Sequence, residues 1–185
     1  MSNIQKTQIN SNPKGYIKAV FGPMFSGKTT FLIEHINENK ASARVFKPTI
    51  DNRYSNQHIV SHNKHQVLAQ CVSSSEQIKE LIPQVESHLY IDEIQFFDKS
   101  IVDVCNELKN NGHQIVVAGL DMDSEQKEFA TSNKIKEIAD EVINLQGKCN
   151  ACGAPASFTF CKEEKTDQVA VGGPELYECR CSKCI

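Results

Sequence analysis

One eight-residue stretch constrains the fold of this chain more than any other. Gly22 to Thr29, GPMFSGKT, fits the pattern G-x-x-x-x-G-K-[ST] of a phosphate-binding P-loop. An apolar run from Gly15 to Gly22 precedes it, and a helical pattern from Lys28 to about Lys40 follows it. Between a strand and a helix, such a loop points backbone N–H groups at phosphate oxygens, and the helix N-terminus adds partial positive charge. We therefore expect a nucleoside triphosphate to bind here.

The same motif assigns roles to individual side chains. Lys28 is expected to reach the β- and γ-phosphates, and the Thr29 hydroxyl is expected to ligate Mg²⁺. A GTPase is disfavoured, because neither Asn63-Lys64 nor Asn133-Lys134 is followed by the Asp of a guanine-reading motif. The expected phosphate-binding residues of the loop are Gly22, Pro23, Met24, Phe25, Ser26, Gly27, Lys28 and Thr29.

Two adjacent acids, Asp92 and Glu93, follow the mostly apolar run from His88 to Ile91. In a strand, neighbouring side chains point to opposite faces, so the two carboxylates are expected to do different work. Asp92 is assigned to Mg²⁺, and Glu93 to the group in line with the γ-phosphate. If that group is water, Glu93 supports hydrolysis; if it is a substrate hydroxyl, Glu93 is the general base of a phosphoryl transfer. These residues alone leave both acceptors open.

Strand and helix patterns alternate along most of the chain. This alternation predicts an α/β fold with a parallel sheet and helices on both faces. A polar, His-rich stretch at 49–70 is interpreted as a functional loop or small hairpin. Further strands are predicted at 42–48, 88–93, 114–121 and 141–146, and further helices at 75–87, 99–112 and 132–141.

Composition and charge bear on the cellular location and the binding partners of the protein. No apolar run approaches the ~20 residues that span a bilayer. Residues 1–14 are polar and lack the apolar centre of a signal peptide, so we interpret them as a disordered tail and expect a cytoplasmic protein without a membrane partner. The net charge is −3 and the Lys and Arg residues are dispersed, which gives no support for nucleic-acid binding.

The eight cysteines are unevenly placed. Cys149 with Cys152, and Cys181 with Cys184, form two CxxC pairs with 28 residues between them. Four thiolates in this arrangement are typical of a closed, structural zinc site, and a redox role is the weaker alternative. Cys179 competes with Cys181, but only Cys181 forms a CxxC pair with Cys184. The chain changes character at Gly147, which predicts a P-loop domain at 15–147 and a zinc-binding module at 148–185.

The P-loop GPMFSGKT, the run DEIQFF from Asp92 to Phe97 and the two CxxC pairs together resemble the type II (zinc-containing, cytosolic) thymidine kinase family. The resemblance covers Gly15 to Ile185. Further matches are Lys47-Pro48 before Asp51-Asn52-Arg53-Tyr54, Gly119-Leu120-Asp121, and Gly172-Gly173 with Tyr177 four residues before Cys181. The resemblance implies a RecA-like P-loop domain with a mainly parallel sheet, and a small C-terminal zinc-binding lasso that closes over the nucleoside.

By this resemblance the chain is an ATP-dependent thymidine kinase that makes dTMP in nucleotide salvage and also accepts deoxyuridine. Glu93 is then the base that takes the proton from the thymidine 5′-hydroxyl, while Asp92 and Thr29 serve Mg²⁺. Phosphate contacts are implied for Asp51, Arg53 and Gln95. Nucleoside contacts are implied for Met24, Phe96, Leu120, Ser124, Phe129, Thr159, Gln168, Val169, Ala170, Val171, Gly172 and Tyr177, although Phe96 and Leu120 also suit a plain core.

The resemblance further implies a homotetramer inhibited by thymidine triphosphate, with ATP, Mg²⁺ and structural Zn²⁺ as cofactors. Two positions depart from the family pattern. Ser124-Glu125 replaces an aromatic residue followed by a basic or amide residue, and Cys161 replaces a basic residue. The first change removes an apolar contact near the nucleoside and adds negative charge. The alternatives from other classes are a zinc-ribbon P-loop ATPase acting on nucleic acid and a non-catalytic nucleotide sensor.

Overall fold

A six-stranded parallel sheet forms the centre of the computed structural model, which describes residues 15–49, 58–60, 66–82, 87–163 and 172–185. The strand order is β5-β2-β6-β7-β1-β8, and every neighbouring pair is parallel. The predicted α/β fold is thereby confirmed. The strands are β1 (Tyr16–Phe21), β2 (Ala43–Pro48), β5 (Gln70–Val72), β6 (His88–Ile91), β7 (Gln114–Gly119) and β8 (Glu141–Asn144).

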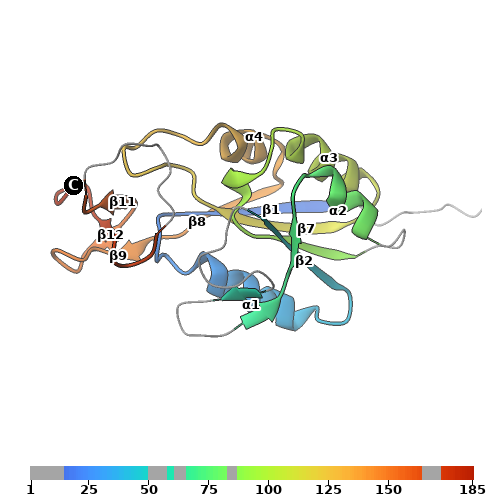
Figure 1. Ribbon diagram of the computed structural model, residues 1–185, viewed down its shortest axis with the longest axis horizontal. Coiled ribbons are helices and arrows are strands. Elements are labelled where there is room, and N and C mark those ends of the chain that lie inside the picture. Colours follow the sequence, from blue (N-terminus) through green and yellow to red (C-terminus); the bar gives the residue numbers. More distant parts are fainter. Residues whose placement is uncertain (1–14, 50–57, 61–65, 83–86, 164–171) are drawn as a thin grey trace, which may run out of the picture.

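Helices cover both faces of this sheet (Figure 1). Helix α1 (Lys28–Glu38) lies on one face, and α2 (Glu76–Leu81), α3 (Ile101–Asn110) and α4 (Ala130–Ile138) lie on the other. Alternation along β1 explains the two layers: Ile17, Ala19 and Phe21 join the core cluster of α3 and α4, whereas Val20 joins the cluster of α1. A strand buried on both faces must be apolar throughout, and β1 is nearly so.

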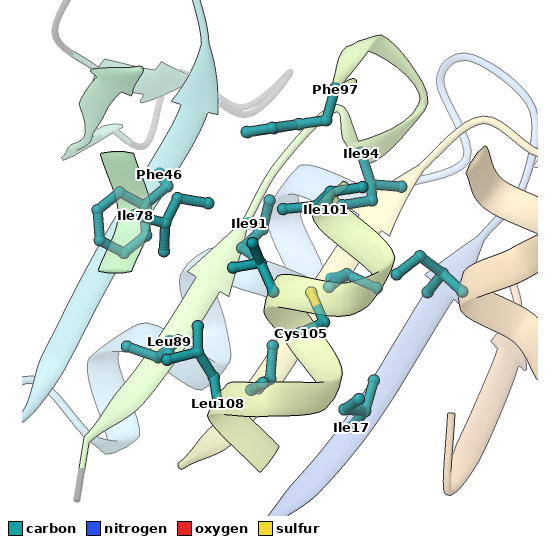
Figure 2. Packing of buried hydrophobic residues seen from close by; sticks show 14 of the residues in the cluster. Ile17, Phe46, Ile78, Leu89, Ile91, Ile94, Phe97, Ile101, Cys105 and Leu108 are labelled. Atoms are coloured by element: carbon teal, nitrogen blue, oxygen red, sulfur yellow. The ribbon is translucent and has the colours of Figure 1, made fainter. Parts of the chain in front are cut away.

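Helix α3 packs on the sheet through one apolar stripe. Ile101, Cys105 and Leu108 are buried, and their spacing of four and three residues places them on one side of the helix. Figure 2 shows this stripe against Leu89 and Ile91 of β6. The packing fixes the position of β6, whose carboxyl end carries the acidic pair.

Two predicted elements end earlier than expected. The helix predicted at 75–87 ends at Leu81, and Ile82 is already extended at φ −92° and ψ 145°. Pro83 follows it, and a residue before proline is disfavoured in the helical region. The strand predicted at 88–93 ends at Ile91, because Glu93 adopts a left-handed conformation with φ 53°.

Part of the predicted loop at 49–70 also has regular structure. Strands β3 (His58–Val60) and β4 (Gln66–Leu68) form an antiparallel pair, which agrees with the hairpin interpretation. Strand β5 begins at Gln70 and joins the edge of the main sheet beside β2, which was not predicted. Helix α4 was predicted at 132–141, but it begins at Ala130 and ends at Ile138, and Glu141 starts β8.

Two small antiparallel pairs follow the main sheet. Strand β9 (Gly147–Lys148) pairs with β10 (Pro155–Ala156), and β11 (Phe158–Cys161) pairs with β12 (Tyr177–Arg180). The domain boundary at Gly147 stays a prediction, as does the tail at 1–14, which lies outside the described residues. Among the described residues, no helix combines the length and the apolar character needed to cross a membrane.

Replacing Gly15 with alanine should destabilise the fold. A Cβ at this position would lie 1.9 Å from the Lys109 carbonyl oxygen and 2.9 Å from that of His113, and both are backbone atoms. We expect Gly15→Ala to lower the free energy of unfolding by about 1–3 kcal/mol, as other overpacked sites do. The urea midpoint of the variant measures this change.

Gly173→Ala is the matched control, because its Cβ would first meet the carboxylate end of the Glu175 side chain. A flexible side chain can move where backbone cannot, so this midpoint should stay near that of the native chain. Equal midpoints for the two variants would contradict the packing described for Gly15.

Candidate active site

The P-loop connects β1 to α1 at the carboxyl edge of the sheet. Gly22, Phe25 and Gly27 all have positive φ angles, of 152°, 64° and 89°. These left-handed turns let the loop curl back over the start of α1. Lys28, the first residue of α1, is buried, and its Nζ donates hydrogen bonds to the carbonyl oxygens of Gly22 (2.9 Å) and Pro23 (2.7 Å).

Acidic side chains from neighbouring strand ends face this lysine. Burial lowers the pKa of Lys28, and the negative charges of Glu93, Asp92 and Asp121 act to raise it. Asp92 and Glu93 follow β6, and Asp121 follows β7. Ligands of open parallel sheets bind at this carboxyl edge, so the arrangement places a buried cation where a ligand would enter.

The hydroxyl of Ser26 offers a test of whether the loop suits a phosphate group. Its Oγ is buried and has no hydrogen-bond partner among the residues that the structure describes. Within the described ranges, Ser75 Oγ is the only other buried side-chain nitrogen or oxygen atom of which this is true. A buried polar atom without a partner is costly, and a phosphate oxygen would accept a bond from this hydroxyl. The loop residues therefore fit the triphosphate expected from the sequence.

The two acids lie in a turn that follows β6 rather than in the strand itself. Asp92 is buried, and its Oδ1 accepts the backbone N–H of Glu93 at 3.0 Å. Glu93 is half-buried and holds a left-handed φ of 53°, a strained conformation for a residue with a side chain. The prediction that the carboxylates diverge rested on strand alternation, and that reason was wrong because β6 has already ended.

Gln95 joins Glu93 to the end of β7. Its Oε1 accepts the backbone N–H of Leu120 at 2.9 Å, and its Nε2 donates to Oε2 of Glu93 at 2.5 Å. A backbone N–H can only donate, so the amide oxygen must face Leu120 and the amide nitrogen must face Glu93. Gly119 leaves room for this arrangement, since a Cβ there would lie 2.4 Å from Gln95 Oε1. The phosphate contact expected for Gln95 stays a prediction.

Three of the expected nucleoside-binding residues, Phe96, Leu120 and Phe129, lie in the segments that follow β6 and β7. Phe96, in the short helix η1 (Ile94–Phe96), and Phe129, before α4, pack edge to face with ring centroids 6.5 Å apart. Leu120 is buried after β7, and Ser132 Oγ donates to its carbonyl oxygen at 2.6 Å. Tyr177 is buried at the start of β12.

Other expected residues fall elsewhere. Ser124 is half-buried in the turn after β7, and exposed Glu125 pairs with Lys127 at 2.6 Å, which partly neutralises the added charge. Gly172 is half-buried close to Leu176. Asp51, Arg53, Gln168, Val169, Ala170 and Val171 lie outside the described residues, so their roles stay predictions.

The C-terminal strands reach back to the P-loop. The backbone N–H of Met24 donates to Thr159 Oγ1 at 2.9 Å, and Cys179 Sγ donates to the carbonyl oxygen of Met24 at 2.8 Å. Thr159 was expected near the nucleoside, whereas Cys179 was considered only as a competing metal ligand. Burial raises the pKa of the Cys179 thiol, so it remains a hydrogen-bond donor at neutral pH.

The four cysteines of the CxxC pairs come together as expected. The Sγ atoms of Cys149, Cys152, Cys181 and Cys184 all lie within 4.8 Å of one another. Burial raises the pKa of Cys149, but backbone hydrogen bonds from Cys181, Cys152 and Ala151 outweigh it and lower this pKa to about 6. Hydrogen bonds with Cys152 and Cys181 raise the pKa of Cys184 to about 12. Four sulfur ligands this close suit a tetrahedral zinc ion.

A parallel α/β sheet with this loop and these acids at its carboxyl edge defines a P-loop nucleotide-binding protein. Residues 15–185 match the family model described as "Thymidine kinase". The chain therefore belongs to the thymidine kinase family, as its motifs suggested.

One solved structure adds only a general likeness. It is domain III of the replication initiation protein DnaA from Thermotoga maritima, with 17% sequence identity and a TM-score of 0.40. The match covers 70% of this chain and 54% of that one.

Family membership makes the protein a nucleoside kinase, and supports thymidine phosphorylation in general. The alternative of a zinc-ribbon ATPase acting on nucleic acid is not favoured by this match. The four-cysteine cluster is compatible with the zinc that the resemblance implies.

Removing one cysteine of the cluster should release the metal. We expect Cys149→Ser to lose stoichiometric zinc and to lower the melting temperature, because three thiolates cannot close a structural tetrahedral site. Metal analysis of the purified protein measures the zinc content. Cys161→Ser is the control, since Cys161 lies in β11 outside the cluster and should leave zinc bound. Full zinc content in Cys149→Ser would refute the four-cysteine site.

Proposed function

We propose that the protein transfers the γ-phosphate of ATP to the 5′-hydroxyl of thymidine, and that deoxyuridine is a second acceptor. One observation carries the proposal beyond the family match: the Glu93 carboxylate is held by Gln95 beside the buried lysine of a phosphate-binding loop. A fixed carboxylate next to a phosphate site is what a general base of phosphoryl transfer requires.

The phosphate groups are bound by the loop. In this proposal the Lys28 amine exchanges the carbonyl oxygens of Gly22 and Pro23 for the β- and γ-phosphate oxygens, and the Ser26 hydroxyl gains an acceptor. Thr29 and Asp92 would hold Mg²⁺, which neutralises charge on the phosphates when bound. Asp51, Arg53 and Gln95 are assigned to the same region on the resemblance alone.

Glu93 moves the proton. Its carboxylate takes the hydrogen of the nucleoside 5′-hydroxyl while that oxygen forms a bond to the γ-phosphorus, and ADP leaves with the electron pair of the broken P–O bond. The chemistry depends on position more than on a reactive side chain. The bonds of Gln95 to Glu93 and Leu120 provide that position.

The nucleoside is assigned to the space bounded by Met24, Phe96, Leu120, Phe129 and Tyr177. The Thr159 hydroxyl accepts a bond from Met24, so its own hydrogen is suited to a carbonyl oxygen of the pyrimidine. Ser124, the backbone from Gln168 to Gly172 and a zinc-tethered lasso at 148–185 complete the proposed site. The homotetrameric state and a cytoplasmic location are proposed from the family resemblance.

Glu93→Gln should greatly reduce turnover while leaving nucleotide binding nearly intact. We expect kcat for thymidine to fall by about 10²–10⁴-fold, the usual contribution of a general base. Transfer of labelled γ-phosphate measures kcat, and calorimetric titration measures ATP affinity. Glu107→Gln, which changes an exposed acid of α3 paired with Lys79, is the control.

A panel of nucleosides with ATP and Mg²⁺ tests the acceptor itself. Phosphorylation of thymidine and deoxyuridine ahead of other nucleosides would support the proposal. Full activity in Glu93→Gln would refute the base assignment. ATP hydrolysis stimulated by DNA, with no nucleoside phosphorylated, would refute the kinase function.

Gln95→Glu should change the pH dependence of the reaction. The new carboxylate would face Glu93, and two carboxylates this close share a proton, so the apparent pKa of the base should rise. We therefore expect the acidic limb of the kcat–pH profile, measured at saturating ATP, to move to higher pH. Gln95→Met, which is close in volume but adds no charge, should lower kcat without moving that limb. Unchanged kcat and pH profiles in both variants would contradict the positioning role of Gln95.

A further inference from the structure

We propose that the β11–β12 hairpin sets the triphosphate affinity of the P-loop by holding the backbone of Met24, with Thr159 and Cys179 as its positioning residues. The proposal concerns nucleotide binding and goes beyond the identity of the nucleoside acceptor.

Met24 is held at both of its backbone polar groups. Its N–H donates to Thr159 Oγ1 at 2.9 Å, and its carbonyl oxygen accepts from Cys179 Sγ at 2.8 Å. Thr159 and Cys179 are direct partners in the β11–β12 register, and both are buried, at 4% and 1% exposure. A residue bonded on both sides cannot rotate either adjoining peptide without breaking one of these hydrogen bonds.

The position of Met24 matters because of what surrounds it. It lies between Pro23, whose carbonyl oxygen accepts from Lys28, and Phe25, which has a left-handed φ of 64°. Rotation of the peptides at Met24 would therefore displace both the lysine acceptor and the turn of the loop. The hairpin thus stabilises the loop shape that points its backbone N–H groups at phosphate.

The hairpin is joined in turn to the four-cysteine cluster. The Cys179 carbonyl oxygen accepts from the Asn150 N–H at 2.9 Å, and the Cys179 N–H donates to Asn150 Oδ1 at 3.0 Å. Asn150 lies inside the first CxxC pair, between Cys149 and Cys152. Close packing reinforces the link, since a Cβ on Gly147 would lie 2.4 Å from Cys179 Sγ. A continuous set of contacts therefore runs from the cluster through Cys179 to the P-loop.

Two pairs of variants of the zinc-loaded protein test the proposal. Thr159→Val and Cys179→Ala each remove one bond to Met24, while Thr159→Ser keeps the hydroxyl and Cys179→Ser replaces the thiol donor with a hydroxyl donor. ATP affinity is measured by calorimetric titration with Mg²⁺ and without nucleoside, and zinc content is measured in parallel. Cys161→Ser, in the same hairpin, is the control.

We expect Thr159→Val and Cys179→Ala to bind ATP about tenfold more weakly, the effect of one hydrogen bond, with zinc content unchanged. Thr159→Ser should retain most of the native ATP affinity, and the control Cys161→Ser should bind ATP as the native chain does. Native ATP affinity in both Thr159→Val and Cys179→Ala would overturn the proposal. Loss of zinc in Cys179→Ala would also overturn it, because Cys179 would then act as a metal ligand.

These outcomes are independent of the proposed reaction. The ATP affinity of each variant can be measured by titration even if the protein does not phosphorylate thymidine. Conversely, normal thymidine turnover with unchanged ATP affinity in the variants would refute only the role of the hairpin. A weakened affinity that Thr159→Ser restores distinguishes the hydrogen bond from a general loss of folding.

Discussion

The buried ammonium group of Lys28 is the interaction on which the site depends. A charge removed from water is costly unless polar groups replace its hydration. Here the carbonyl oxygens of Gly22 and Pro23 accept its hydrogen bonds, and carboxylates at the ends of β6 and β7 oppose the effect of burial. The parallel sheet brings these groups together, because its strands all deliver their carboxyl ends to one edge. The topology of the sheet therefore determines which groups surround the Lys28 ammonium group.

Local sequence patterns were sufficient to predict the fold class and the loop. The P-loop has a fixed spacing, and the strand–helix alternation is regular, so both were read correctly. The helix after Ser75 was predicted too long. It ends at Leu81, and Pro83 in the sequence indicates an end near this point. Strand β5 has three residues, too few for an alternation to stand out, and it is fixed by pairing with β2. Such a strand is specified by its neighbour more than by its own residues.

The remaining features of the site depend on contacts that are distant in sequence. Gln95 bonds to Leu120 across 25 positions, and Cys179 bonds to Met24 across 155. Neither hydrophobic periodicity nor a local sequence motif predicts contacts between residues so far apart in the chain. The different roles expected of Asp92 and Glu93 rested on strand alternation, which does not apply because Glu93 lies in a left-handed turn that glutamate rarely adopts. The four-cysteine cluster was predictable because its spacing itself encodes the chemistry.

The turn at Glu93 also bears on how the protein balances folding against activity. A φ of 53° suits glycine, which adopts it without steric cost, whereas glutamate must be forced into it by the surrounding structure. The backbone at this point would thus be more stable without a side chain. The chain instead carries a carboxylate there, so part of its backbone strain lies in the residue nearest the proposed chemistry. Evolution toward greater stability at this position would remove the group that the site is built to hold.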